Sequence, residues 1–199
     1  MAEAVRISAL AGCLQAGRHG VQSGEPGITL RELRPAAMAA INGAPAPQDL
    51  GRRLAQFPGA TPSPRRAAGG PELELLWSGP DQFLAVSERL GPGALVDTLA
   101  SSLSGTDATV VDLSHGRTVL VLEGAACREL LAKGCALDVD AMESGECVPT
   151  LLSHFNVLLH CDGEQSFRLY VMRSFGEACY RWLLHAGAEF GVEVVVADG

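Results

Sequence analysis

The chain has 199 residues, 47% of them hydrophobic, and it carries a formal net charge of −8 at pH 7. This length suits one large domain or two small lobes that share a core, and this apolar content argues against a chain that is disordered throughout. An acidic chain repels nucleic acid unless it carries a basic stripe, and the pairs Arg52-Arg53 and Arg65-Arg66 are too short to form one. Nucleic acid is therefore not an expected partner.

Targeting and redox signals are weak in this sequence. No stretch of about 18 consecutive apolar residues is present, so no membrane partner is predicted. Leu10 to Cys13 has the form of a lipoprotein cleavage box, but Glu3 and Arg6 interrupt the preceding segment. The six cysteines form no Cys-x-x-Cys pair and no finger-like spacing with histidine. We expect a cytoplasmic protein with reduced thiols and no structural metal.

The first elements expected along the chain are two loops around a short helix. Residues 42–48 and 58–71 are rich in proline, glycine and alanine, which sustain neither a helix nor a strand ladder. Asp49 is predicted to be the N-cap of the helix between them, and Pro58 to end it. The apolar face of this helix consists of Leu50, Leu54 and Phe57.

A hairpin and a helix are expected next. Residues 72–77 alternate, with Leu73, Leu75 and Trp77 on one buried face. Residues 78–81 have turn chemistry and 83–86 form the returning strand. The helix that follows is predicted from the helical spacing of Leu95, Leu99 and Leu103.

The middle of the chain predicts a second hairpin and a second helix. Strands at 109–113 and 118–122 are joined by a turn at 114–116. The helix begins after Gly124, and Gly134 is expected to end it as a left-handed cap. Its buried stripe consists of Cys127, Leu130 and Leu131.

The last third predicts further strands and a well-marked helix. The strands are expected near 150–152, 157–161 and 167–171. Ser174 and Glu177 fit a capping box, Gly191 ends the helix, and residues 192–196 form a closing strand. The apolar face of the helix consists of Ala178, Cys179, Trp182, Leu183, Ala186 and Phe190.

Tightly connected neighbouring strands pair antiparallel, which predicts an α+β fold with antiparallel sheets covered by helices on one face. The repeated strand-strand-helix unit indicates two ferredoxin-like lobes, with a seam near residues 104–107.

Asp112, Ser114 and His115 together suggest a hydrolytic triad. Neighbours along a strand and turn point in different directions, however, and no Gly-x-Ser-x-Gly elbow is present. We favour a simple turn, and an enzyme that uses Asp112 and His115 stays as a rival hypothesis. No glycine-rich phosphate loop is found, so no catalytic or nucleotide-binding residue is assigned.

His154, His160 and Cys161 share a strand-rich stretch, where metal binding would need ligands on one face. Phe155-Asn156 has the character of a break between strands, which favours structural histidines. Trp77, Trp182 and Phe175 are expected in the core or, alternatively, at a partner interface.

Arg31 and Arg173 are the residues we expect at a partner interface. Lys133-Gly134-Cys135 matches part of a motif of folate-binding aminomethyltransferases, but Ala136-Leu137-Asp138 replaces the Gly-Gln-Glu that completes it. No acidic residue suited to a pterin is recognised, so no cofactor is assigned to this chain.

Several motifs occur in an order that resembles the gamma subunits of heterotetrameric sarcosine oxidase. They are Gly27-Ile28-Thr29-Leu30-Arg31-Glu32, residues 76–84, residues 111–118, residues 130–139, and Arg173-Ser174-Phe175 with Trp182-Leu183. The resemblance implies an N-terminal extension at 1–26, a first lobe at 27–105 with a variable loop at 58–71, and a second lobe at 106–199. It also implies a fold similar to the folate-binding domain of aminomethyltransferases.

This family implies a non-catalytic, structural subunit. The complex oxidatively demethylates sarcosine to glycine and forms hydrogen peroxide and 5,10-methylenetetrahydrofolate. Alpha, beta and delta subunits are the implied partners, and FAD, FMN, NAD, zinc and tetrahydrofolate are expected in those partners. The alternative is a stand-alone folate-binding protein that resembles an aminomethyl carrier.

Overall fold

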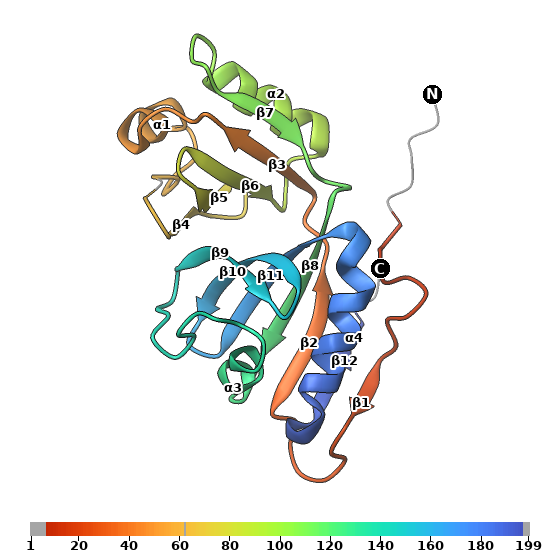
Figure 1. The fold of residues 1–199 in the computed structure, drawn as a ribbon. Helices are drawn as coiled ribbons and strands as arrows, with labels where there is room; N and C mark the ends of the chain where they lie inside the picture. Colours follow the sequence, from red (N-terminus) through yellow and green to blue (C-terminus); the bar gives the residue numbers. More distant parts are fainter. Residues whose placement is uncertain (1–6, 62, 197–199) are drawn as a thin grey trace.

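The computed structural model describes residues 7–61 and 63–196 and is drawn in Figure 1. Within these residues, a seven-stranded sheet has the order β1-β12-β2-β8-β11-β10-β9, and a five-stranded sheet has the order β4-β5-β6-β3-β7. The larger sheet consists of β1 (Gly17–His19), β2 (Ile28–Leu33), β8 (Arg117–Glu123), β9 (Cys147–Leu152), β10 (Phe155–Gly163), β11 (Ser166–Met172) and β12 (Val192–Val195). The smaller sheet consists of β3 (Ala37–Asn42), β4 (Ala67–Gly69), β5 (Glu74–Gly79), β6 (Gln82–Ser87) and β7 (Thr109–Asp112).

The helices and sheets stack in four layers. The helices are α1 (Pro47–Arg53), α2 (Pro92–Ser102), α3 (Cys127–Ala132) and α4 (Gly176–Ala186), with 3₁₀ turns η1 (Arg173–Phe175) and η2 (Ala188–Phe190). Helices α1 and α2 pack on one face of the smaller sheet, and α3 and α4 pack on one face of the larger sheet. The two remaining faces pack against each other through a third apolar cluster, which includes Leu76, Val119 and Tyr170. The α+β fold with helices on one face of each sheet is confirmed, and Figure 1 shows the smaller sheet above the larger one.

Each sheet is built on a ferredoxin-like succession of elements. The smaller sheet follows β3-α1-β5-β6-α2-β7, with β4 added at its edge. The larger sheet follows β8-α3-β10-β11-α4-β12, with β2 inserted between β8 and β12 and β9 added at the edge. Because β12 runs parallel to β2, the larger sheet is mixed, whereas the smaller sheet is antiparallel.

The strands are shared between the sheets differently from the division expected at residues 105 and 106. Strand β2 joins the strands of the C-terminal half, and β7 stays beside β3 in the smaller sheet. Residues 7–26 of the expected N-terminal extension also contribute to the larger unit, because β1 pairs with β12 and Leu10 is fully buried. The chain therefore crosses between the sheets at residues 34–36 and again at 113–116.

The predicted hairpin between 109–113 and 118–122 is wrong. The turn at 114–116 exists, but β7 pairs with β3, whereas β8 pairs with β2 and β11. Residues 118–122 are buried on both faces, which is typical of a central strand, whereas β7 is largely exposed at an edge. The sequence of a tight turn is compatible with a hairpin and with a connection between two sheets. Here the burial of β8 on both faces favours the connection between sheets.

The first predicted hairpin and most helical faces are confirmed. Strands β5 and β6 pair antiparallel around Gly79 and Asp81. The residues predicted for the apolar faces of α1, α2 and α3 are all buried. Leu76, placed on the polar face by sequence, is also fully buried, because that face of β5 contacts the larger sheet.

The predicted side-chain caps are not formed. Helix α1 begins after Ala46 with Pro47 in its first turn, and Asp49 pairs instead with Arg52. Helix α4 begins at Gly176 after the η1 turn, so no capping box is made, and Glu177 bonds to Arg181. Its apolar face also differs from the prediction, since Ala178 is exposed and Tyr180 is buried.

Gly134 does not adopt the left-handed conformation that a helix cap would need. A Cβ atom at this position would lie 2.6 Å from the Trp182 ring, which explains the glycine by close packing. Trp77 and Trp182 pack partly buried against the apolar clusters, but Phe175 is 45% exposed, contrary to a core position. Among the described residues, no helix has the length and apolar character needed to cross a bilayer.

Candidate functional site

Ser114 is a structural residue in the turn between β7 and β8. Its hydroxyl donates to the Met38 carbonyl at 3.2 Å and accepts from the Met38 amide at 3.0 Å. The Asp112 carboxylate accepts from the Ser114 amide at 2.8 Å, and His115 is exposed. Because Ser114 is fully buried and bonded to β3, the three residues do not form a triad.

The histidines considered as metal ligands are not brought together. The break lies at Ser153 and His154, and β10 runs unbroken from Phe155. His154 is exposed and stacks on Phe155 at 4.0 Å between ring centroids. His160 faces the smaller sheet, whereas Cys161 packs in the helix-side core, so neighbouring positions on β10 point to opposite faces.

His160 belongs to a polar cluster between the sheets that sequence reasoning missed. We call Glu74, His160, Asp162 and Arg168 the intersheet ion cluster. The Arg168 guanidinium lies 2.9 Å from the Asp162 carboxylate and 3.4 Å from the Glu74 carboxylate. One ligand atom from each of Glu74, His160 and Asp162 lies within 4.8 Å of the others. Arg168 already supplies one positive charge there, which the two carboxylates share.

Burial dominates the titration of this cluster. It raises the pKa of Glu74, although the Arg168 guanidinium opposes that shift. It lowers the pKa of His160 to about 4, with Asp162 opposing the shift and Arg168 adding to it. Because His160 and Asp162 are two residues apart on β10, the sequence could have predicted that they share a face of the strand. Glu74 comes from the other sheet, so no local pattern in the sequence indicates that it lies near them.

His160 is expected to make folding depend on pH. The folded state keeps the imidazole neutral, so the unfolded state binds more protons as pH falls from 6.5 towards about 4. The contribution of His160 to the free energy of unfolding is therefore constant above this pH window and decreases as the pH falls through it. Between pH 7 and pH 5, we expect the wild type to lose about 2 kcal/mol more unfolding free energy than His160→Leu. Urea unfolding at both pH values tests this prediction, with exposed His154→Leu as a control that keeps the wild-type loss. Equal losses in wild type and His160→Leu would contradict it.

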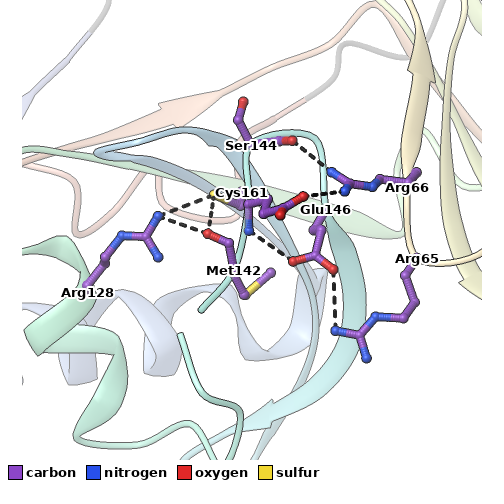
Figure 2. A network of polar contacts seen from close by, with 8 residues as sticks. Arg65, Arg66, Arg128, Met142, Ser144, Glu146 and Cys161 are labelled. Carbon is purple, nitrogen blue, oxygen red and sulfur yellow. Dashed lines mark hydrogen bonds and ion pairs between the residues drawn. The ribbon is translucent and has the colours of Figure 1, made fainter. Parts of the chain in front are cut away.

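The segment 58–71, expected to be a loop, contains β4. Its two arginines also make polar contacts with residues 143–146, which precede β9 of the larger sheet. Figure 2 shows that Arg65 and Arg66 reach the segment before β9. Arg66 bonds to the Glu143 carboxylate at 2.5 Å and to the Ser144 carbonyl at 3.0 Å, and Arg65 lies 3.5 Å from Glu146. Strand β4 consists only of alanine and glycine, which have little strand preference of their own, and it forms because β5 supplies its hydrogen-bonding partner. The basic pair therefore joins segments far apart in the sequence.

The side chains of Lys133 and Cys135 contact other residues of this chain and do not surround a ligand site. The Lys133 ammonium bonds to Glu189 and to the Ala186 carbonyl, and it lies 4.5 Å from the centre of the Phe190 ring. The Cys135 thiol is buried 3.6 Å from the Thr150 hydroxyl. These contacts attach α3 to the end of α4 and to β9.

The two predicted interface arginines lie in different surroundings. Arg31 on β2 is 3.5 Å from the Glu123 carboxylate of β8. Arg173 follows β11 and lines an open hollow of about 570 Å³, which we call the Arg173 hollow and which also includes Ser8, Gly116, Met172 and Ser174. Within this hollow Met172 is 47% exposed, and Phe175, two residues after Arg173 in the sequence, is 45% exposed.

A family model described as "Sarcosine oxidase, gamma subunit family" matches residues 60–189. The sarcosine oxidase subunit gamma of Corynebacterium sp. (strain U-96) is 34% identical over 87% of this chain and 85% of its own length. The chain belongs to this family. A second relative, subunit gamma from Arthrobacter sp., is 35% identical over 80% of this chain and 72% of its own length.

The gamma subunit family fold is also found among solved structures. A chain of the heterotetrameric sarcosine oxidase from Corynebacterium sp. U-96, solved in complex with pyrrole 2-carboxylate, is 31% identical with a TM-score of 0.79. That comparison covers 93% of this chain and 96% of the other. Aminomethyltransferase T from Bartonella henselae shares the fold at 18% identity and a TM-score of 0.65, over 85% of this chain and 48% of its own length.

Proposed function

We propose that this chain is the non-catalytic gamma subunit of a heterotetrameric sarcosine oxidase, which oxidatively demethylates sarcosine to glycine with formation of hydrogen peroxide and 5,10-methylenetetrahydrofolate. The observation that carries this proposal is the similarity over nearly the whole length to a chain of such a complex, at 31% identity. The family match over residues 60–189 supports the same role.

The internal contacts of the candidate chemical groups support a structural role. Ser114 is buried and bonded to Met38, and Lys133 is paired with Glu189. His160 lies in the intersheet ion cluster, where Arg168 pairs with both carboxylates. These groups stabilise the packing of one element on another, which leaves the chemistry to other subunits.

We therefore assign the reactive groups to the alpha, beta and delta subunits. FAD, FMN, NAD, zinc and tetrahydrofolate belong to those partners under this proposal, and this chain contributes shape and contact area. The cytoplasm is the compartment in which we expect the complex to act.

The Arg173 hollow is the part of the surface that we assign to docking. Arginine, methionine and aromatic side chains are enriched at protein interfaces, and here Arg173 lies beside the exposed side chains of Met172 and Phe175. Arg31 is a weaker candidate, since Glu123 already pairs with it.

Co-expression with the alpha, beta and delta subunits is expected to yield a stable complex that contains this chain. Arg173→Glu should weaken its association with the other three subunits about tenfold or more, because it reverses the one charge among the described residues that line the hollow. Arg181→Glu, on the exposed face of α4, is the matched control. Affinity between immobilised chain and the alpha-beta-delta assembly measures the effect.

Three results would contradict the proposal. One is a stable, folded chain that does not associate with the alpha, beta and delta subunits. Another is loss of sarcosine turnover by a complex that carries Asp112→Ala and His115→Ala. The third is tight, stoichiometric binding of tetrahydrofolate to the chain alone, which would favour the folate-binding alternative suggested by the shared fold.

A further inference from the structure

A cavity of about 420 Å³ opens between the two sheets beyond their apolar contact. Strands β3, β5 and β6 line it from the smaller sheet, and β8, β9 and β10 line it from the larger sheet. Its volume lies in the range of small-molecule sites, which is roughly 300–1,000 Å³. Leu84, Leu113 and Leu158 contribute apolar parts of a mixed lining.

Arg117 is the one charged residue in the described lining of this cavity. It is the first residue of β8, and it shares a face with Val119, which packs between the sheets. The side chain is therefore directed into the intersheet space rather than towards the helices.

The Arg117 guanidinium lacks a partner within the described chain. Among residues 7–61 and 63–196, no carboxylate forms an ion pair with it and no side-chain hydrogen bond is found. Burial lowers the pKa of Arg117, and no neighbouring charge opposes that shift. A half-buried cation without a counter-charge is unfavourable, and an incoming anion would relieve this cost.

The other polar groups of the cavity are neutral. Asn42, Gln82 and Asn156 provide side-chain amides, and Ser78 provides a hydroxyl. A single cation, a few neutral hydrogen-bonding groups and apolar walls suit a ligand with one anionic end and an apolar body. A carboxylate suits the cation, because guanidinium and carboxylate can form two parallel hydrogen bonds.

We propose that the cavity between the sheets is a binding site for a carboxylate carried on an apolar body, with Arg117 as the anchoring cation. The carboxylate can come from a free small molecule or from an acidic side chain of a partner subunit. The inference rests on the cavity alone and does not require the proposed function.

The test titrates the full chain with 2-naphthoate and, separately, with the uncharged 2-naphthalenemethanol. We expect saturable binding of 2-naphthoate, at least tenfold tighter than that of the alcohol. Arg117→Met should weaken the binding of 2-naphthoate at least tenfold without changing the affinity for the alcohol. The affinity of Arg117→Lys for 2-naphthoate should lie between those of the wild type and Arg117→Met. Arg31→Met, which changes an arginine outside the cavity, should bind as the wild type does.

Side-chain amide NMR signals provide a measurement on the wild type that does not depend on a variant folding. Naphthoate should shift the amides of Asn42, Gln82 and Asn156, and the alcohol should shift them less. The proposal is overturned if the wild type binds both probes equally, or binds neither, or if folded Arg117→Met binds naphthoate as tightly as the wild type.

The same titration on the complex with alpha, beta and delta distinguishes the two sources of the carboxylate. Binding that persists in the complex indicates a free small molecule. Binding seen on the chain alone and lost on assembly indicates that a partner's acidic side chain occupies the site. Failure of the chain to join any complex would count against the proposed function but would leave the binding to the chain alone unaffected.

Discussion

Gly124→Ala is expected to lower the free energy of unfolding by about 4 kcal/mol, because it combines a backbone clash with an unfavourable conformation. Gly124 has φ +134°, and an added Cβ would lie 2.3 Å from the Gly27 carbonyl oxygen. That oxygen accepts the Ala126 amide at 3.1 Å, so moving it away would also break the bond that starts α3. Urea unfolding followed by tryptophan fluorescence measures the loss.

Gly105→Ala is the matched control for the conformation without the clash. Gly105 has φ +77° and no atom within 4 Å of an added Cβ, so we expect a loss of about 1 kcal/mol. A loss for Gly124→Ala no larger than that for Gly105→Ala would show that the approach of Gly27 to Gly124 is not tight.

Arg168→Met is expected to destabilise the protein by about 3 kcal/mol at neutral pH, because two partly buried carboxylates would lose their shared cation. The side chains of Arg168, Glu74 and Asp162 are 19%, 21% and 29% exposed, so water screens the unpaired charges poorly. The loss should be smaller at pH 5, since burial already raises the pKa of Glu74 and the variant would protonate it more readily. Thermal and urea unfolding at both pH values measure this.

Two further variants isolate the charge effect. Adding Glu74→Gln to Arg168→Met should recover part of the lost stability, because one unpaired carboxylate is removed. Arg181→Met breaks an exposed pair with Glu177, whose side chains are 69% and 52% exposed, and should cost less than about 1 kcal/mol. A cost for Arg168→Met that equals the cost for Arg181→Met would mean that the intersheet ion cluster contributes little.

The candidate sites show how far local patterns reach. The turn at 114–116 is predicted correctly, although it joins two sheets rather than a hairpin, and the burial of Ser114 against Met38 leaves no local signal because its partner lies far away in the sequence. The sequence predicts a structural role for His160, but its neighbour Glu74 belongs to the other sheet and is not predicted. The role of Arg117 depends on the faces of both sheets at once, and the sequence around it carries no sign of a cavity.

The sequence by itself determined the apolar faces of α1, α2 and α3, the β5–β6 hairpin, the α+β class and the family resemblance, because periodic burial and ordered motifs are local properties of the chain. The tertiary structure alone decided that β2 and β7 exchange places relative to the expected lobes and that Leu76 is buried. It also decided the capping of α1 and α4 and the close contact of Gly134 with Trp182. Strand partners and sheet-to-sheet contacts follow from which apolar faces can be buried together, and that choice depends on residues distant in sequence.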